Sequence, residues 1–291
     1  MTYRSLTHAI PGLETSDGAG VKLRRSIGSM PSNRLDPFLM LDEFGTDRPE
    51  DYIAGFPPHP HRGFETVTYM LAGHMRHEDH MGNVGELTEG GVQWMTAGRG
   101  VIHSEMPQQK EGLMRGFQLW VNLPAAEKMK PASYKDIPAA DIPVAEFDWG
   151  SIKVIAGNFA TDKGDVAGPI VAGPIQGLTT APVFYDVQLA ADKTFDTALP
   201  ATHSAFIYSY EGDVSIDTTS EQRILSAQTA GVLSAGDLLR VTAHADSAKF
   251  IVVAGMPLNE PVVQHGPFVM NTREQIEQAI HDYQNGTLVA A

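Results

Sequence analysis

Short alternating runs bounded by glycine and proline constrain the fold of this chain more than any other feature. Residues 63–71, 183–189, 204–210 and 249–254 place β-branched or aromatic side chains at every second position. The 28 glycines and 19 prolines separate such runs along the whole chain. A period of two is typical of half-buried strands, so the sequence predicts an all-β fold of sandwiches or barrels.

One segment departs from this pattern, at the C-terminus. Its apolar residues fall on one face of a helix, at Ile276, Ala279, Ile280 and Tyr283. Asn271 and Thr272 offer an N-cap, with the acidic Glu274 following at capping-box spacing. Gly286 is placed to end the helix. We therefore predict a helix near residues 272–285.

A proline-rich stretch, residues 124–150, is the best candidate for a connection between domains. It carries Pro124, Pro131, Pro138 and Pro143, and the alternating pattern resumes after it. Glycine-containing turns separate candidate strands on both sides of this stretch, at Gly73 and at Gly212. We predict two β-domains of similar design, residues 1–136 and 137–291, with the helix at the end of the second.

Composition excludes several classes of protein. The net charge of −14 disfavours direct nucleic-acid binding, which needs clustered cations against phosphates. The 291 residues include no cysteine, so a disulfide scaffold, a thiolate metal site and a cysteine nucleophile are excluded. No apolar run of about 18 residues is present, and the N-terminus lacks the pattern of a secretory signal. We expect a cytoplasmic protein with no membrane partner.

The first chemically informative motif is His59-Pro60-His61. On an extended segment, residues two apart point to the same face, so both imidazoles can converge on one ion. Pro60 stiffens the segment and favours a sheet edge.

The second motif, His103-Ser104-Glu105, repeats this geometry on another candidate strand. Two such pairs on facing strands would place three imidazoles and one carboxylate around a metal ion. Glu65 competes for the carboxylate role if its strand continues regularly from the first motif. His74, His77 and His80 form a third cluster, which we interpret as a solvated loop because Gly73 and Gly82 flank it.

These motifs, with four other stretches, resemble the pirin family, a two-domain branch of the cupin superfamily. The matching residues are 24–28 (RRSIG), 35–44 (LDPFLMLDEF), 58–69 (PHPHRGFETVTY), 93–100 (QWMTAGRG) with His103 and Glu105, 255–261 (GMPLNEP) and 266–272 (GPFVMNT). The resemblance implies two cupin-type β-sandwich domains, a bicupin, with metal in the first domain alone. It implies His59, His61, His103 and Glu105 as ligands, with Glu65 in reserve.

Pirins are similar to quercetin 2,3-dioxygenases, which open a flavonol ring with O₂. The resemblance thus implies a metal-dependent dioxygenase with an aromatic, flavonol-like substrate. Glu105 and Arg62 are the catalytic candidates, and Arg62 or Arg99 could hydrogen-bond a ligand carboxylate. Candidates for an apolar substrate slot are Phe56, Met70, Trp94, Met95, Phe117 and Trp120.

Three imidazoles and a carboxylate suit Fe(II), which we expect here, and also Ni, Mn, Cu or Zn. Two other functions fit the same ligands. One is a regulatory protein that senses redox state and acts through protein partners without turnover, as the resemblance to eukaryotic pirins implies. The other is a non-redox metal enzyme such as an isomerase.

Overall fold

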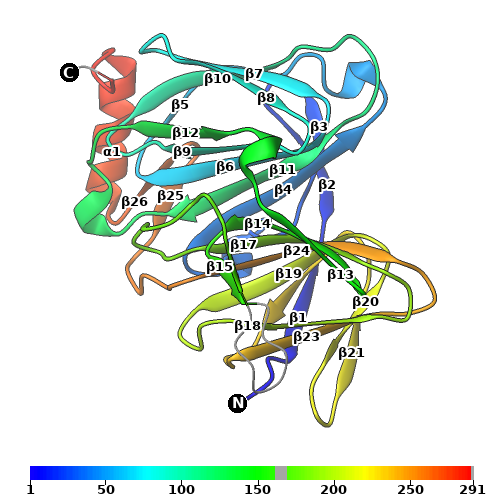
Figure 1. Cartoon of the computed structure of the whole chain (residues 1–291). Coiled ribbons are helices and arrows are strands. Elements are labelled where there is room, and N and C mark those ends of the chain that lie inside the picture. Colours follow the sequence, from blue (N-terminus) through cyan, green and yellow to red (C-terminus); the bar gives the residue numbers. More distant parts are fainter. Residues whose placement is uncertain (161–168, 290–291) are drawn as a thin grey trace. The chain divides into compact units, whose positions relative to one another are not determined.

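The computed structural model describes residues 1–160 and 169–289 of the chain. It divides into two compact units. The histidine unit comprises Leu13–Ser29, Phe38–Ala139 and Leu258–Ala291, and the companion unit comprises Met1–Gly12, Met30–Pro37 and Ala140–Pro257. Each unit contains one seven-stranded and one four-stranded antiparallel sheet (Figure 1).

The histidine unit is a sandwich in which the chain passes several times from one sheet to the other. The seven-stranded sheet has the order β12-β9-β6-β11-β4-β3-β2 and the four-stranded sheet the order β5-β10-β7-β8. The strands are β2 Leu13–Asp17, β3 Val21–Arg25, β4 Phe38–Thr46, β5 Phe56–His61, β6 Phe64–Ala72, β7 His74–Asp79, β8 Val84–Thr88, β9 Val92–Thr96, β10 Val101–Pro107, β11 Met114–Asn122 and β12 Ser133–Ile137.

The companion unit repeats this arrangement. Its sheets have the orders β1-β22-β19-β24-β17-β14-β13 and β18-β23-β20-β21. The strands are β1 Leu6–Pro11, β13 Val144–Phe147, β14 Gly150–Ala156, β17 Val183–Leu189, β18 Thr194–Ala198, β19 Ser204–Glu211, β20 Val214–Asp217, β21 Gln222–Leu225, β22 Thr229–Leu233, β23 Leu238–Ala243 and β24 Ala248–Gly255. A separate small pair joins β15 Asn158–Ala160 to β16 Ile170–Ala172.

Strands β4 to β11 and β17 to β24 match one for one in chain order and sheet position. The predicted turns take part in this match, since Gly73 lies between β6 and β7 and Gly212 between β19 and β20. Gly212 has a φ of +74°, and a Cβ there would lie 2.5 Å from the carbonyl oxygen of Ser247. The predicted all-β architecture of two similar domains is confirmed.

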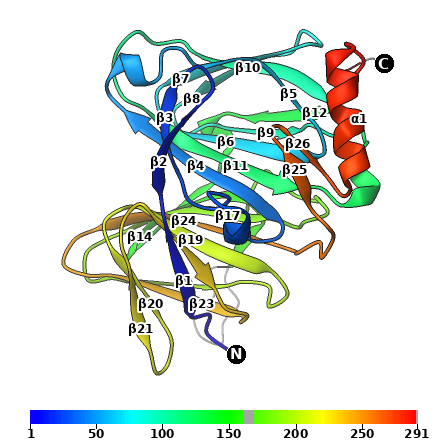
Figure 2. The ribbon, with the colours of Figure 1, turned by 180° about the vertical axis from the view of Figure 1, so that it is seen from behind.

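The C-terminal residues form a hairpin, β25 Val263–His265 and β26 Phe268–Met270, followed by helix α1 Arg273–Gln284 (Figure 2). The predicted helix is confirmed, but its capping box pairs Thr272 with Gln275, so Glu274 is not the reciprocal partner. Short 3₁₀ helices cover Pro31–Asn33, Pro49–Asp51, Ala125–Glu127 and Ala139–Asp141. None of the helices in the described ranges is both long and apolar enough to span a membrane.

The units do not coincide with the expected halves at the two ends of the chain. The connection near residue 139 lies close to the expected boundary. However, β1 pairs with β22 and belongs to the companion unit, while residues 258–291 belong to the histidine unit. The terminal helix is therefore part of the histidine unit, because its apolar face packs on the β25–β26 hairpin there.

Candidate metal centre

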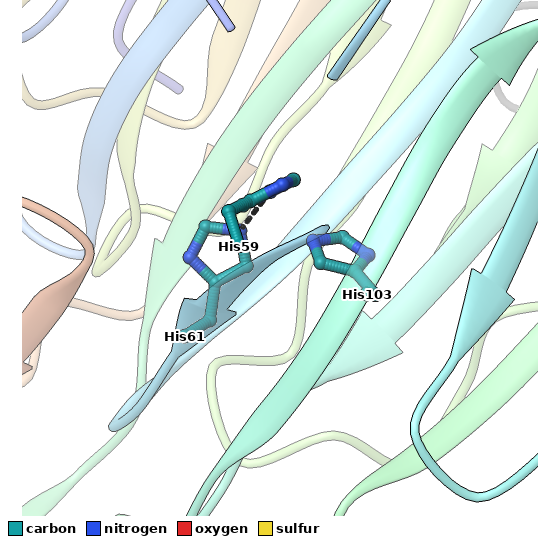
Figure 3. A group of neighbouring side chains, drawn as sticks. All are labelled: His59, His61 and His103. Carbon is teal, nitrogen blue, oxygen red and sulfur yellow. Dashed lines mark hydrogen bonds between the residues drawn. The ribbon is translucent and has the colours of Figure 1, made fainter. Parts of the chain in front are cut away.

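Three histidines from two neighbouring strands meet inside the histidine unit. His59 and His61 lie on β5, and His103 lies directly opposite His59 on β10. One ring nitrogen from each residue lies within 4.8 Å of the others (Figure 3). The Nε2 atoms of His59 and His61 are 3.1 Å apart. The structure thus brings together the three predicted imidazoles, from motifs more than forty residues apart in the sequence.

The surroundings hold the rings of His61 and His103 in place and favour their neutral forms. The His61 ring packs edge-on against Phe64 and Trp120, with centroids 5.0 and 5.3 Å away. Burial, and then the neighbouring His59, lower the pKa of His61 well below the usual imidazole value. Burial and the two other rings do the same to the pKa of His103. Neutral imidazole is the form that binds metal, so the fold prepares these side chains as ligands.

A fourth histidine fixes the orientation of His103. Nε2 of His77, on β7, lies 2.5 Å from Nδ1 of His103. The buried Nε2 of His103 has no hydrogen-bond partner. If His103 donates its Nδ1 proton to His77, this free Nε2 carries a lone pair toward the other imidazoles. An unpartnered buried nitrogen in a cluster of imidazoles fits a bound metal ion.

The prediction of a solvated loop at residues 74–80 is wrong. His74–Asp79 forms strand β7, and His77 is only 3 % exposed. Long-range pairing of β7 with β10 causes this, because it places His77 opposite Glu105. The signal in the sequence was the spacing of Met75 and His77, two residues apart as on one face of a strand. The flanking glycines obscured this signal.

Glu105 is buried on the same strand as His103, two residues along it. Its Oε1 accepts a hydrogen bond of 3.1 Å from the Thr68 hydroxyl. Thr68 is also 2.7 Å from Oε1 of Gln118. The carboxylate lines the same cavity as His59 and His61, although it lies outside the 4.8 Å group of the three imidazoles.

Glu65, the alternative carboxylate ligand, accepts hydrogen bonds from two side chains outside the histidine triad. The Trp94 indole donates to one of its oxygens at 3.1 Å and the Thr96 hydroxyl to the other at 2.7 Å. Burial raises the pKa of Glu65, against these two hydrogen bonds. Glu65 would continue the face of the histidine pair only if one strand ran on regularly, and this condition is not met, because Gly63, with φ +91°, separates β5 from β6.

Arg62 does not reach the candidate carboxylate. Its Nη1 forms an ion pair of 2.7 Å with Asp282, its Nη2 lies 3.4 Å from the Leu288 carbonyl, and its Nε donates to the Arg99 carbonyl. The guanidinium of Arg62 faces helix α1 and the chain leading to β10, so the catalytic role of Arg62 stays a prediction without a contact to Glu105 behind it. In this position the guanidinium of Arg62 does not contact the Glu105 carboxylate.

A cavity of about 620 Å³ opens beside His59 and His61. Of the expected apolar residues, Phe56 and Trp120 line it, whereas Met70, Trp94, Met95 and Phe117 are buried core residues outside it. Sequence reasoning missed most of the remaining wall. That wall includes Leu23, Met40, Phe44, Met75, Gln118, Gln264 and Pro267.

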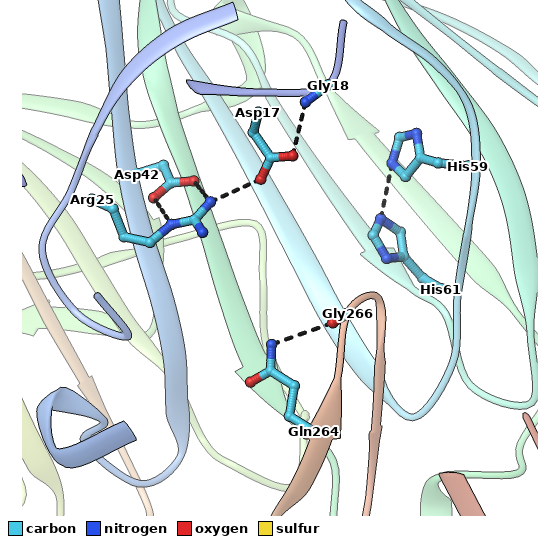
Figure 4. A network of polar contacts seen from close by, with 8 residues as sticks. All are labelled: Asp17, Gly18, Arg25, Asp42, His59, His61, Gln264 and Gly266. Atoms are coloured by element: carbon cyan, nitrogen blue, oxygen red, sulfur yellow. Dashed lines mark hydrogen bonds and ion pairs between the residues drawn. The ribbon is translucent and has the colours of Figure 1, made fainter. Parts of the chain in front are cut away.

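The wall also carries an ion cluster that the sequence did not reveal (Figure 4). Arg25 makes two hydrogen bonds of 2.7 Å to the buried carboxylate of Asp42. The same guanidinium contacts Asp17 at 2.9 Å. Burial raises the pKa of Asp42, while its hydrogen bonds with Arg25 oppose that rise. The cavity therefore combines apolar side chains with a small set of charged and polar groups, as ligand sites commonly do.

Comparisons with known proteins agree with this arrangement. The family model described as Pirin matches residues 20–121, and the Pirin C-terminal cupin domain matches residues 184–289. The chain belongs to the pirin family. It is 52% identical over 288 residues to a provisionally named quercetin 2,3-dioxygenase of Pseudomonas aeruginosa, covering 98% of both chains. The bicupin fold is thereby shown from sequence as well as structure.

Two solved structures extend the comparison. A quercetin 2,3-dioxygenase of Acinetobacter baumannii matches with a TM-score of 0.87 and 33% identity, over 99% of both chains. A bacterial pirin of Escherichia coli, solved in complex with nickel(II), matches with a TM-score of 0.62 and 18% identity, over 86% of this chain and 98% of that one. The second likeness concerns the fold alone.

Proposed function

We propose that this protein is a metal-dependent dioxygenase of the quercetin 2,3-dioxygenase type, working with Fe(II) on an aromatic, flavonol-like substrate. The observation that carries the proposal is the convergence of three imidazoles beside a cavity of about 620 Å³. The relatives from P. aeruginosa and A. baumannii carry this activity in their names.

In this proposal His59, His61, His103 and Glu105 hold the metal. Neutral imidazoles with one carboxylate leave a divalent cation partly uncompensated in charge, which favours an anionic oxygen ligand from the substrate. Bound iron would supply the one-electron and O₂ chemistry that side chains lack. Nickel, Mn, Cu and Zn are the alternative metals, because imidazole and carboxylate ligands suit them as well.

The remaining work falls to the cavity. Phe56 and Trp120 offer aromatic faces against which a planar substrate can pack, and Met40 and Met75 fill the gaps around it. We propose that the Glu105 carboxylate also receives the proton of the substrate enol hydroxyl. Thr68 holds that carboxylate through its hydroxyl, so the accepting oxygen stays in a fixed position.

Oxygen uptake by protein loaded anaerobically with Fe(II) tests the proposal. Quercetin should start O₂ consumption, and flavonol absorbance should fall in step with it. His103→Ala, treated in the same way, should give only the background rate. Wild-type protein that holds iron but consumes no O₂ with flavonols would contradict the proposal and favour the regulatory alternative. Pull-down of protein partners with oxidised and reduced protein would then examine that alternative.

A further inference from the structure

The two strands that carry the histidine triad are both tied to the C-terminal segment, residues 263–288. Arg62 directly follows His61, and its guanidinium contacts Asp282 and Leu288 of this segment. The same guanidinium donates to the carbonyl of Arg99, four residues before His103. One buried arginine thus connects the end of β5, the approach to β10 and helix α1.

Backbone contacts strengthen the connection at β5. The amide of Val269 donates to the Arg62 carbonyl at 3.0 Å, and the Arg62 amide lies 3.4 Å from the Pro267 carbonyl. The buried ammonium of Lys128 donates to the carbonyls of Gly63 and Val269, at 2.6 and 3.0 Å. Gly63 leaves no room for a side chain, because a Cβ would lie 2.0 Å from the Val269 carbonyl oxygen.

The approach to β10 is held in the same way. A Cβ at Gly100 would lie 2.5 Å from the Leu288 carbonyl oxygen. Ile102, next to His103, packs against the apolar face of the C-terminal segment, with Phe268, Ile276 and Leu288. Three residues of the segment, Gln264, Gly266 and Pro267, also line the cavity beside the triad.

We propose that the C-terminal segment sets the spacing of the histidine triad, and that Asp282 is its positioning residue, acting through Arg62. Both oxygens of Asp282 are used, one by Arg62 at 2.7 Å and the other by Gln278 at 2.7 Å. Without Asp282, the guanidinium of Arg62 loses its counter-charge while it stays buried, next in sequence to His61. It must then move, and the end of β5 moves with it.

The proposal predicts faster release of metal without loss of the fold. Outer partners of metal ligands typically alter metal affinity by about 10–100-fold. Asp282→Ala should therefore release metal about tenfold faster than the wild type. Asp282→Asn keeps a neutral hydrogen bond to Arg62 and should lie between the two.

A matched control lies on the same helix. Glu277 pairs with Arg273 at 3.9 Å, and both side chains are exposed. Glu277→Ala removes a carboxylate from α1 without contact to Arg62, so its release rate should equal that of the wild type.

The experiment uses Co(II)-loaded protein, whose visible spectrum reports the ligand geometry. Release is started with excess chelator at a temperature where circular dichroism shows every variant folded. Asp282→Ala should shift the Co(II) spectrum as well as the rate, which a general loss of stability would not do. In an Arg62→Met background, Asp282→Ala should add no further acceleration, because Asp282 acts through Arg62.

The outcomes separate this inference from the proposed function, on whose metal site it rests. Wild-type release rates and spectra in both Asp282 variants would overturn it, as would equal acceleration by Glu277→Ala. Multiplying effects in the double variant would also overturn it. Faster metal release from Asp282→Ala, with no dioxygenase activity in the wild type, would support the positioning role and contradict the proposed function. Wild-type protein that takes up no Co(II) would overturn both.

Discussion

The two units of this chain use one strand plan for different purposes. In the four-stranded sheet of the histidine unit, β10 turns Val101, His103 and Glu105 inward. In the companion unit the matching strand, β23, turns Leu239, Val241 and Ala243 inward. His103 pairs with His59 across the strands, whereas Val241 pairs with Phe195. The same positions hold candidate ligands in one unit and apolar core in the other.

This difference shows how a β-sandwich can carry a site. The interior of the companion unit is one continuous apolar cluster that includes Phe195, Val241 and Phe250. The histidine unit divides its apolar residues into smaller clusters around the imidazoles and the cavity. Buried neutral imidazoles cost stability that apolar side chains would contribute. We infer that metal binding offsets this cost in the histidine unit.

Removal of a histidine of the triad should have the largest effect on the difference between the two units. His61→Ala and His103→Ala should each reduce bound metal from one ion per chain to none, while the circular dichroism spectrum of a folded β-protein remains. Elemental analysis after anaerobic loading measures this. His244→Ala, in the companion unit, is the control and should keep full metal content. Unchanged metal in either triad variant would remove that residue from the ligand set.

Truncation of a core side chain in the companion unit should have the opposite result, a loss of stability without a loss of metal. Phe195 is fully buried and packs against Trp149 and Phe250, with ring centroids 5.2 and 5.9 Å away. Phe195→Ala should lower the free energy of unfolding by about 3–5 kcal/mol, the usual cost of such a cavity. Metal content should stay at the wild-type level. Chemical denaturation and elemental analysis test both parts, and loss of metal with the fold intact would contradict the division of labour.

The two carboxylates sharpen the comparison within the histidine unit. Glu105→Gln should weaken metal binding by about 100-fold or more, since loss of a ligand exceeds the usual effect of losing its outer partner. Glu65→Gln should stay close to the wild type, because Glu65 hydrogen-bonds Trp94 and Thr96. Competition against a metal indicator dye gives both affinities. The reverse order would favour Glu65 as the ligand.

Local periodicity was enough to predict part of this structure. Alternation placed His59 with His61 and His103 with Glu105, because it depends only on residues two apart. The burial of His77 depends on pairing between distant strands. Membership of residues 1–12 in the companion unit rests on β1 pairing with β22, over 200 residues later. No local pattern in the sequence predicts such long-range contacts.

His77 offers the most sensitive test of the comparison between the two units. It lies on β7, and the matching strand of the companion unit is β20. That strand carries apolar residues, Val214 and Ile216, at its inward positions. His77→Phe keeps a ring but removes the hydrogen-bond partner of the His103 Nδ1 atom. His103 then loses the partner that directs its lone pair to the metal, and affinity should fall about tenfold.

His74 supplies the control for this last variant. It lies on the same strand, but it is partly exposed and contacts Glu86 at 2.6 Å. His74→Phe should therefore leave metal affinity unchanged, and the two variants can be titrated with the same indicator. Equal affinities for both would mean that His103 keeps its orientation through packing alone. In that case the three imidazoles on β5 and β10 would suffice, and β7 would serve only as part of the core of the histidine unit.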